Sequence, residues 1–147
     1  MISGESGCGK STLTGKLLQQ GCGFLADDIA AVLFEGEQPI IPPTFPYQKL
    51  CRDAALSQGY DPKDLIYIDE EKDKFLVHYK GTFEDSPTPL KAMFVLEIAE
   101  GDKVTMQELV GAAKLQACMN ALFLAPLLGE SLYAPENGIR VLKFASR

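Results

Sequence analysis

The chain has 147 residues, of which 46% are hydrophobic and 23% are charged, and its formal net charge at pH 7 is -6. This composition is typical of a globular protein, and the length allows one domain with a substantial core. The acidic balance argues against a nucleic-acid-binding surface and against a surface that binds anionic membranes.

The cysteines and the apolar stretches indicate where the protein works. Lysine, glutamine, asparagine and proline interrupt the most apolar stretch, residues 112–128, so we expect a buried helix there and no membrane span. We find no signal peptide. The widely spaced cysteines contain no C-x-x-C pair and predict neither a zinc site nor a disulfide framework: Cys8, Cys22, Cys51 and Cys118. These features favour the cytoplasm.

The first dozen residues contain the complete phosphate-binding loop pattern G-x-x-x-x-G-K-[ST], from Gly4 to Ser11. Its glycines let successive backbone N–H groups point at an anion, and the positive end of the following helix adds to the attraction. Lys10 is expected to reach the β- and γ-phosphates, and the Ser11 hydroxyl to bind Mg²⁺. The predicted site for ATP and Mg²⁺ consists of Gly4, Glu5, Ser6, Gly7, Cys8, Gly9, Lys10, Ser11 and Thr12. A glycine-rich turn that binds no phosphate is the alternative.

Local patterns predict the elements of the first half of the chain. Only Met1 to Ser3 precede the loop, so we expect the first strand to be truncated to a stub. The elements that follow are a helix over 10–20 with Leu13, Leu17 and Leu18 on one face, a strand over 23–26, a strand over 29–34, an extended proline-rich loop over 39–46 and a helix over 47–58.

The second half is predicted to be richer in strands. The expected elements are strands over 65–68 and 75–77 about a polar turn, a surface loop over 82–89 and a buried strand over 92–96. A capping box at Thr105 and Glu108 is expected to open a long helix that is broken near Pro126. The tail over 139–144 is ambiguous between strand and helix. This order predicts a single α/β domain over residues 1–147 with a mixed sheet.

Phosphoryl transfer needs carboxylates besides the loop, for the metal and for the accepting hydroxyl. Asp27 and Asp28 are favoured, because they follow an apolar strand directly after the loop helix, and a right-handed crossover would return that strand beside the loop. A capping pair at a turn is the structural alternative for them. Glu97 is a second candidate for the metal or its surroundings, since it also follows a predicted strand.

At this point the residues resemble a family. The loop Gly4–Ser11, a helix, Gln20-Gly21 and then Phe24-Leu25-Ala26-Asp27-Asp28 resemble the catalytic domain of HPr kinase/phosphorylase and its shortened, HPr-kinase-related cousins. The proline-rich stretch 39–46, followed by Arg52 and Asp53, is also similar to those cousins.

The resemblance implies a fold and a reaction. The implied fold is the α/β P-loop fold of the phosphoenolpyruvate carboxykinase type, in a protein that assembles as a homo-oligomer. Asp27 would be the general base toward a serine-type hydroxyl, and Asp28 would bind Mg²⁺ together with Ser11. The activity implied is ATP- and Mg²⁺-dependent transfer of the γ-phosphoryl group.

The acceptor and two other function classes stay open. The arginine-glycine-leucine-glycine segment of true HPr kinase/phosphorylases is missing, so the acceptor is either a protein serine or a small molecule. A nucleotide-binding sensor or scaffold without turnover is one alternative. A fragment of an ABC-type ATPase is the other, because the loop sequence also looks like theirs, although the Leu-Ser-Gly-Gly-Gln segment and the later Walker B strand of that class are not found.

Overall fold

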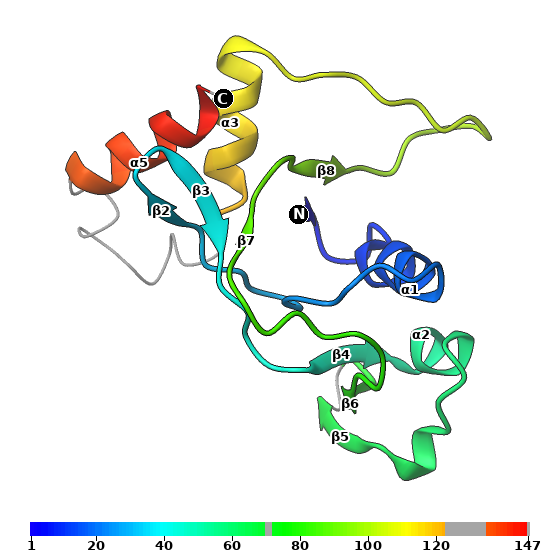
Figure 1. Ribbon diagram of the computed structural model, residues 1–147. Helices are drawn as coiled ribbons and strands as arrows, with labels where there is room; N and C mark the ends of the chain where they lie inside the picture. Colours follow the sequence, from blue (N-terminus) through cyan, green and yellow to red (C-terminus); the bar gives the residue numbers. More distant parts are fainter. Residues whose placement is uncertain (70–71, 123–134, 147) are drawn as a thin grey trace. The chain divides into compact units, whose positions relative to one another are not determined.

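The computed structural model of the chain describes residues 1–69, 72–122 and 135–146, and it is a mixed α/β structure of helices and small sheets (Figure 1). Two compact units form: the first contains Met1 and residues 9–93, and the second contains residues 2–8 and 94–147. Parallel and antiparallel strand pairs occur in separate sheets, so the described residues do not form the single mixed sheet that we expected.

The first unit begins with α1 (Lys10–Gln19), which confirms the helix predicted after the phosphate loop. Gly9 caps its start with a φ of 95°, and Gly21, with a φ of 89°, follows its end. Both are left-handed conformations that favour glycine. The residue that α1 buries is Gly15, which packs against the side chain of Gln58, whereas Leu13 is 38% exposed. Of the predicted leucine face, Leu17 and Leu18 are half-buried and only Leu13 is exposed.

A three-stranded antiparallel sheet with α2 on one face holds the core of this unit (Figure 1). The strand order is β4 (Tyr47–Cys51), β6 (Lys74–His78) and β5 (Ile66–Asp69), while α2 (Arg52–Ser57) and the short 3₁₀ helix η1 (Pro62–Asp64) lie between β4 and β5 in the chain. The core cluster consists of Leu50, Ala55, Phe75 and Val77. The predicted hairpin about the polar turn is thus confirmed.

The helix predicted over residues 47–58 is wrong in its first five residues. In β4, buried Gln48 and Leu50 alternate with exposed neighbours, which is the period of a strand. The apolar positions of this stretch fit either period when they are taken alone, and pairing with β6 decides in favour of the strand. The helix begins only at Arg52.

A second antiparallel sheet lies in the same unit. It contains β2 (Leu33–Glu35), β3 (Gln38–Ile41) and β7 (Thr88–Pro89), in that order. A turn at Gly36, with a φ of 59°, joins β2 to β3. Ile40 and Ile41 are buried, so the start of the predicted proline-rich loop is instead a strand.

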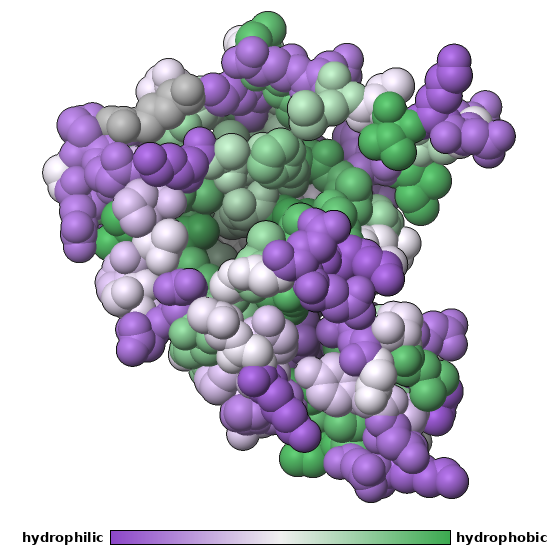
Figure 2. Space-filling view, turned by 45° about the vertical axis from the view of Figure 1, so that its right-hand side comes forward, coloured by the Kyte–Doolittle hydropathy of each residue, from purple (hydrophilic) through white to green (hydrophobic). Residues whose placement is uncertain are grey.

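The second unit contains a parallel pair of strands and two helices. The strands are β1 (Ile2–Gly4) and β8 (Phe94–Leu96), and α3 (Gly111–Asn120) contacts α5 (Pro135–Ala145). The β1 stub is confirmed. The predicted burial of the strand over 92–96 is wrong, because Phe94 is 52% exposed and Val95 is 36% exposed. Apolar side chains reach the surface in several places in the space-filling view (Figure 2).

The helix predicted from the capping box at Thr105 and Glu108 does not form there, and α3 begins only at Gly111. Gly111 has a φ of 56°, which a right-handed helix running through it does not allow. The predicted break near Pro126 lies outside the described residues. The ambiguous tail is helical, since α5 spans it. None of the helices in the described ranges is long and apolar enough to cross a membrane.

Candidate functional site

The phosphate-loop motif occupies a strand–loop–helix stretch of the chain. β1 ends at Gly4, α1 begins at Lys10, and the loop residues lie between them. The three motif glycines, Gly4, Gly7 and Gly9, have φ values of 142°, 87° and 95°. Residues with a side chain rarely adopt these conformations, so the loop backbone favours glycine at each of these three positions.

Gly4 is also required by its surroundings. A Cβ atom at this position would overlap with the carbonyl oxygen of Leu96 and would lie 2.9 Å from the Sγ atom of Cys8. A backbone hydrogen bond from the Cys8 N–H to the Glu5 carbonyl, 3.4 Å long, closes the turn between them. The loop is therefore curled tightly at its start, which fits the wrapping of backbone around a phosphate group.

The other motif side chains open α1. Lys10 and Ser11 are half-buried and Thr12 is exposed. A phosphate loop that binds a Mg²⁺–nucleotide needs an ammonium for the phosphates and a hydroxyl for the metal at these two positions. Among the described residues, no group of three or more His, Cys, Asp or Glu side chains could hold a metal ion by itself. Mg²⁺ in nucleotide sites takes most of its ligands from phosphates and water, so the motif does not need such a group.

The Asp pair is fixed in the first unit by an aromatic anchor. Phe24 is 2% exposed, and its ring packs against the rings of Tyr79 and Phe83, with centroids 5.2 and 6.0 Å away. Its N–H donates to the Thr82 carbonyl, and its carbonyl accepts from the Glu84 N–H. In place of the predicted strand over 23–26 there is thus a single parallel bridge from Phe24 to Phe83, and Asp27 follows three residues later.

Lys49 holds both carboxylates of the pair. The Asp27 Oδ2 atom accepts a hydrogen bond of 2.7 Å from the Lys49 backbone N–H. The Asp28 Oδ2 atom lies 3.4 Å from the Lys49 Nζ atom, with both side chains roughly half exposed. β4 pairs with β6 on one side only, so Asp27 caps the outer edge of this sheet.

Asp27 is a perturbed carboxyl group. Burial raises its pKa from 3.8 to about 6, and the neighbouring charge of Asp28 adds to the rise. The hydrogen bond from Lys49 and the charges of Lys49 and Lys74 lower the pKa and oppose these effects. A carboxylate with a pKa of about 6 is ionised at pH 7 and accepts a proton more readily than an ordinary aspartate, which suits a general base.

One step of the prediction is wrong. We expected a crossover to place the strand over 23–26 beside β1, but the parallel neighbour of β1 is β8, and Phe24 bridges to Phe83. The carboxylate that follows the strand next to β1 is Glu97. Motif residues 4–8 and Glu97 belong to the second unit, whereas motif residues 9–12 and the Asp pair belong to the first.

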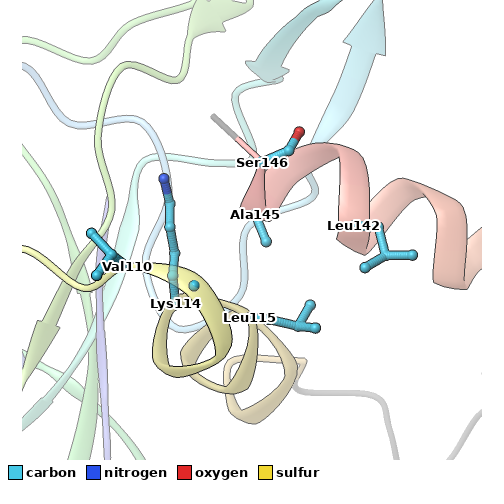
Figure 3. A pocket seen from close by; sticks show the side chains of 7 residues that line it. Val110, Lys114, Leu115, Leu142, Ala145 and Ser146 are labelled. Atoms are coloured by element: carbon cyan, nitrogen blue, oxygen red, sulfur yellow. The ribbon is translucent and has the colours of Figure 1, made fainter.

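A groove of about 400 Å³ between α3 and α5 contains none of the predicted site residues. Leu115 of α3 and Leu142 of α5 lie on facing sides of it (Figure 3). Its lining consists of Val110, Gly111, Lys114, Leu115, Leu142, Ala145 and Ser146. With one charged side chain and no carboxylate, the groove offers no catalytic pair.

Comparison of the chain with protein-family models, with curated proteins and with solved structures gave no match. The functional argument therefore depends on the motif and on the geometry of its surroundings. Sequence reasoning missed Lys49, because residues 47–58 were assigned to a helix. No local signal in the sequence identifies β4 and, with it, this residue, because the alternation of buried and exposed side chains in β4 appears only with its pairing to β6.

Proposed function

We propose that this protein is an ATP- and Mg²⁺-dependent phosphotransferase of the HPr kinase-related type, which transfers the γ-phosphoryl group to a hydroxyl. The observation that carries the proposal is the complete phosphate-loop motif between β1 and α1, in which all three glycines adopt conformations that favour glycine. A glycine-rich turn without a ligand has no need of the lysine and serine that complete the pattern.

The motif residues have separate roles in the proposed reaction. Backbone N–H groups of residues 4–9 bind the phosphates, and the Lys10 ammonium neutralises charge on the β- and γ-phosphates. The Ser11 hydroxyl and the Asp28 carboxylate are the protein ligands of Mg²⁺. The metal supplies charge neutralisation at the phosphates when the nucleotide is bound.

Asp27 is the proposed general base. The acceptor oxygen attacks the γ-phosphorus, the bond from this phosphorus to the bridging β–γ oxygen breaks, and ADP leaves. The proton of the acceptor hydroxyl passes to Asp27. A carboxyl group whose pKa is about 6 suits this role near neutral pH. The Lys49 N–H, which donates to Oδ2, leaves Oδ1 as the atom for the proton.

Three further proposals come with the resemblance. The fold is of the phosphoenolpyruvate carboxykinase type, the protein is a homo-oligomer, and its acceptor is either a protein serine or a small hydroxylated molecule. A cytoplasmic location is proposed separately, from the spacing of the cysteines. Light scattering coupled to gel filtration tests the oligomeric state.

A nucleotide-binding sensor without turnover is the second candidate. It is favoured by the engagement of both aspartates with Lys49, because a capping carboxylate and an ion pair already give Asp27 and Asp28 a structural role. Turnover separates the two functions, since a sensor binds the nucleotide and transfers nothing.

The test is incubation with γ-labelled ATP, Mg²⁺ and a panel of HPr-like proteins and small hydroxylated metabolites. We expect the wild type to label one acceptor class, and Asp27→Asn to bind ATP with wild-type affinity but to transfer no label. Lys10→Ala should lose nucleotide binding, whereas Lys16→Ala, a charge removed from the exposed side of the same helix, should not.

The outcomes separate the alternatives. Full transfer activity in Asp27→Asn contradicts the assigned base. Binding without transfer or hydrolysis in the wild type favours the sensor. Equal binding by Lys10→Ala and the wild type contradicts the phosphate-loop assignment itself.

A further inference from the structure

We propose that the acceptor is a small hydroxylated molecule with an anionic group, a carboxylate or a phosphate, and that Lys74 binds this group beside Asp27. The inference rests on the proposed function, because it takes Asp27 as the base for the acceptor hydroxyl. It narrows the class of acceptor and adds a residue that determines specificity. All of the residues involved belong to the first unit.

The register between β4 and β6 places two lysines on one face of their sheet. Lys49 pairs with Leu76, and Cys51 pairs with Lys74. Paired residues of an antiparallel ladder share a face, and residues two apart on one strand share it as well. Lys49 and Lys74 are therefore diagonal neighbours, with a separation of roughly 7–8 Å between their Cα atoms.

This lysine face of the sheet is open within the first unit. The core cluster lies on the opposite face, where α2 packs against β4 and β6. On the lysine face, Tyr47 is 38% exposed, and Ile66, which pairs with Leu76 from the β5 side, is 64% exposed. The sheet thus has one face for the core and one face that a ligand can reach.

Both lysines are near the proposed base, but they differ in their partners. The backbone N–H of Lys49 donates to Asp27, and its Nζ atom lies 3.4 Å from Asp28 Oδ2. Lys74 is half-buried, and its charge lowers the pKa of Asp27, so the two side chains are close. The ion pairs between described residues do not include the Lys74 ammonium. Of the two lysines, Lys74 is the one that can take an anionic ligand.

Asp69 lies opposite Lys74 on β5, and its carboxylate is engaged elsewhere. Its Oδ1 atom accepts a hydrogen bond of 3.1 Å from the backbone N–H of Lys72, and in the described part of the chain it forms no ion pair with Lys74. A half-buried ammonium attracts an anion more strongly than an exposed one, because less water screens the two charges. The chemistry that fits this position is a carboxylate or a phosphate of the ligand.

An anionic group at Lys74 holds the rest of a short molecule beside Asp27. The acceptor hydroxyl then gives its proton to Asp27, while its oxygen bonds to the γ-phosphorus and the bond from this phosphorus to the bridging oxygen breaks. Binding a group that does not react fixes the position of the one that does. A neutral polyol offers Lys74 no charge and is held less firmly.

The experiment uses two matched series of acceptors: glycerol with glycerate and glycerol 3-phosphate, and sorbitol with gluconate and sorbitol 6-phosphate. Calorimetry measures binding to the full chain, and label from γ-labelled ATP measures transfer. The wild type should prefer at least one anionic compound to its neutral parent by about tenfold or more, the effect of one hydrogen bond to a charged group. The preferred anion identifies the group as a carboxylate or a phosphate.

Lys74→Met should abolish this preference by raising KM for the anionic compound, while kcat changes less. Lys80→Met is the matched control, since it removes the same charge from an exposed position just after β6 and should keep the preference. If circular dichroism shows that Lys74→Met is unfolded, Lys74→Gln takes its place with the same expected result.

The outcomes distinguish this inference from the proposed function. Equal use of neutral and anionic compounds by the wild type, a preference that Lys74→Met keeps, or transfer to an HPr-like protein alone overturns the inference and leaves the proposed function intact. Binding that depends on Lys74 but leads to no transfer supports the anion site and contradicts the phosphotransferase. If the wild type neither binds nor labels any compound of the two series, the inference is wrong.

Discussion

Asp27→Asn is expected to stabilise the folded protein at pH 7 while it abolishes phosphoryl transfer. The pKa of Asp27 is about 6 in the folded chain, against 3.8 for an ordinary aspartate, so ionisation costs more free energy in the folded state than in the unfolded state. The stability associated with the protonated carboxyl is fully present below about pH 4 and is lost as the pH rises through about 6. Asparagine is neutral at every pH in this range, and its Oδ1 atom can still accept the hydrogen bond from Lys49.

The magnitude follows from the size of the pKa change. A tenfold change in an ionisation constant corresponds to about 1.4 kcal/mol, so a rise from 3.8 to about 6 sets an upper limit of about 3 kcal/mol on the effect. Asp27 is only half-buried, and solvent screening reduces the effect to about 1–2 kcal/mol. The variant should therefore be about 1–2 kcal/mol more stable than the wild type at pH 7, and the difference should vanish near pH 4.

Urea unfolding followed by circular dichroism between pH 4 and pH 8 measures this difference. Asp85→Asn, which removes a carboxylate from an exposed position, is the control and should follow the wild type at all pH values. A difference between Asp27→Asn and the wild type that is independent of pH, or that shrinks as the pH rises, would refute the reasoning. A gain of stability together with a loss of transfer is the behaviour expected of a functional residue kept at a structural cost.

Three further substitutions test other parts of the structure. Leu50→Ala removes a fully buried side chain and should destabilise the protein by about 2–5 kcal/mol in urea unfolding, whereas Leu56→Ala, at a site that is 54% exposed, should cost less than about 1 kcal/mol. Gly4→Ala places a Cβ atom against the Leu96 carbonyl, so the loop backbone that contacts the nucleotide must shift. Binding of a fluorescent ATP analogue should therefore weaken at least about tenfold. Binding at the wild-type level would contradict the close approach of Gly4 to Leu96. Gly138→Ala, within α5 and without neighbours that a Cβ atom would meet, should raise the stability by about 0.5–1 kcal/mol, and a loss of stability would argue against an exposed helix there.

The sequence alone predicts the parts of the structure that local chemistry determines. The helix after the loop, its stop at Gly21 and the hairpin of β5 and β6 follow from glycine positions and from strand periodicity over a few residues. The motif glycines are recognisable in the sequence for the same reason, because a backbone with positive φ favours glycine over other residues. Predictions of this kind depend on no distant partner.

What could not be predicted depends on pairing between distant residues. β4 is a strand because β6 lies beside it, and no local signal distinguishes its apolar positions from those of a helix. The neighbour of β1 is likewise more than ninety residues away in the chain, so Glu97 was a candidate by its position at a strand end and not by proximity. The role of Lys49 could not be predicted either, because it depends on β4 and on the segment that carries Asp27.

The most direct test of the proposed kinase is a crystal structure of the protein with Mg²⁺ and a non-hydrolysable ATP analogue. The distance to measure joins the Asp27 carboxylate to the γ-phosphorus. We predict about 6 Å, which leaves room for one acceptor hydroxyl that is hydrogen-bonded to the carboxylate and in line with the phosphorus. A bound nucleotide whose γ-phosphorus lies more than about 10 Å from a carboxylate that still caps β4 would contradict the assignment, because no single hydroxyl could contact both groups.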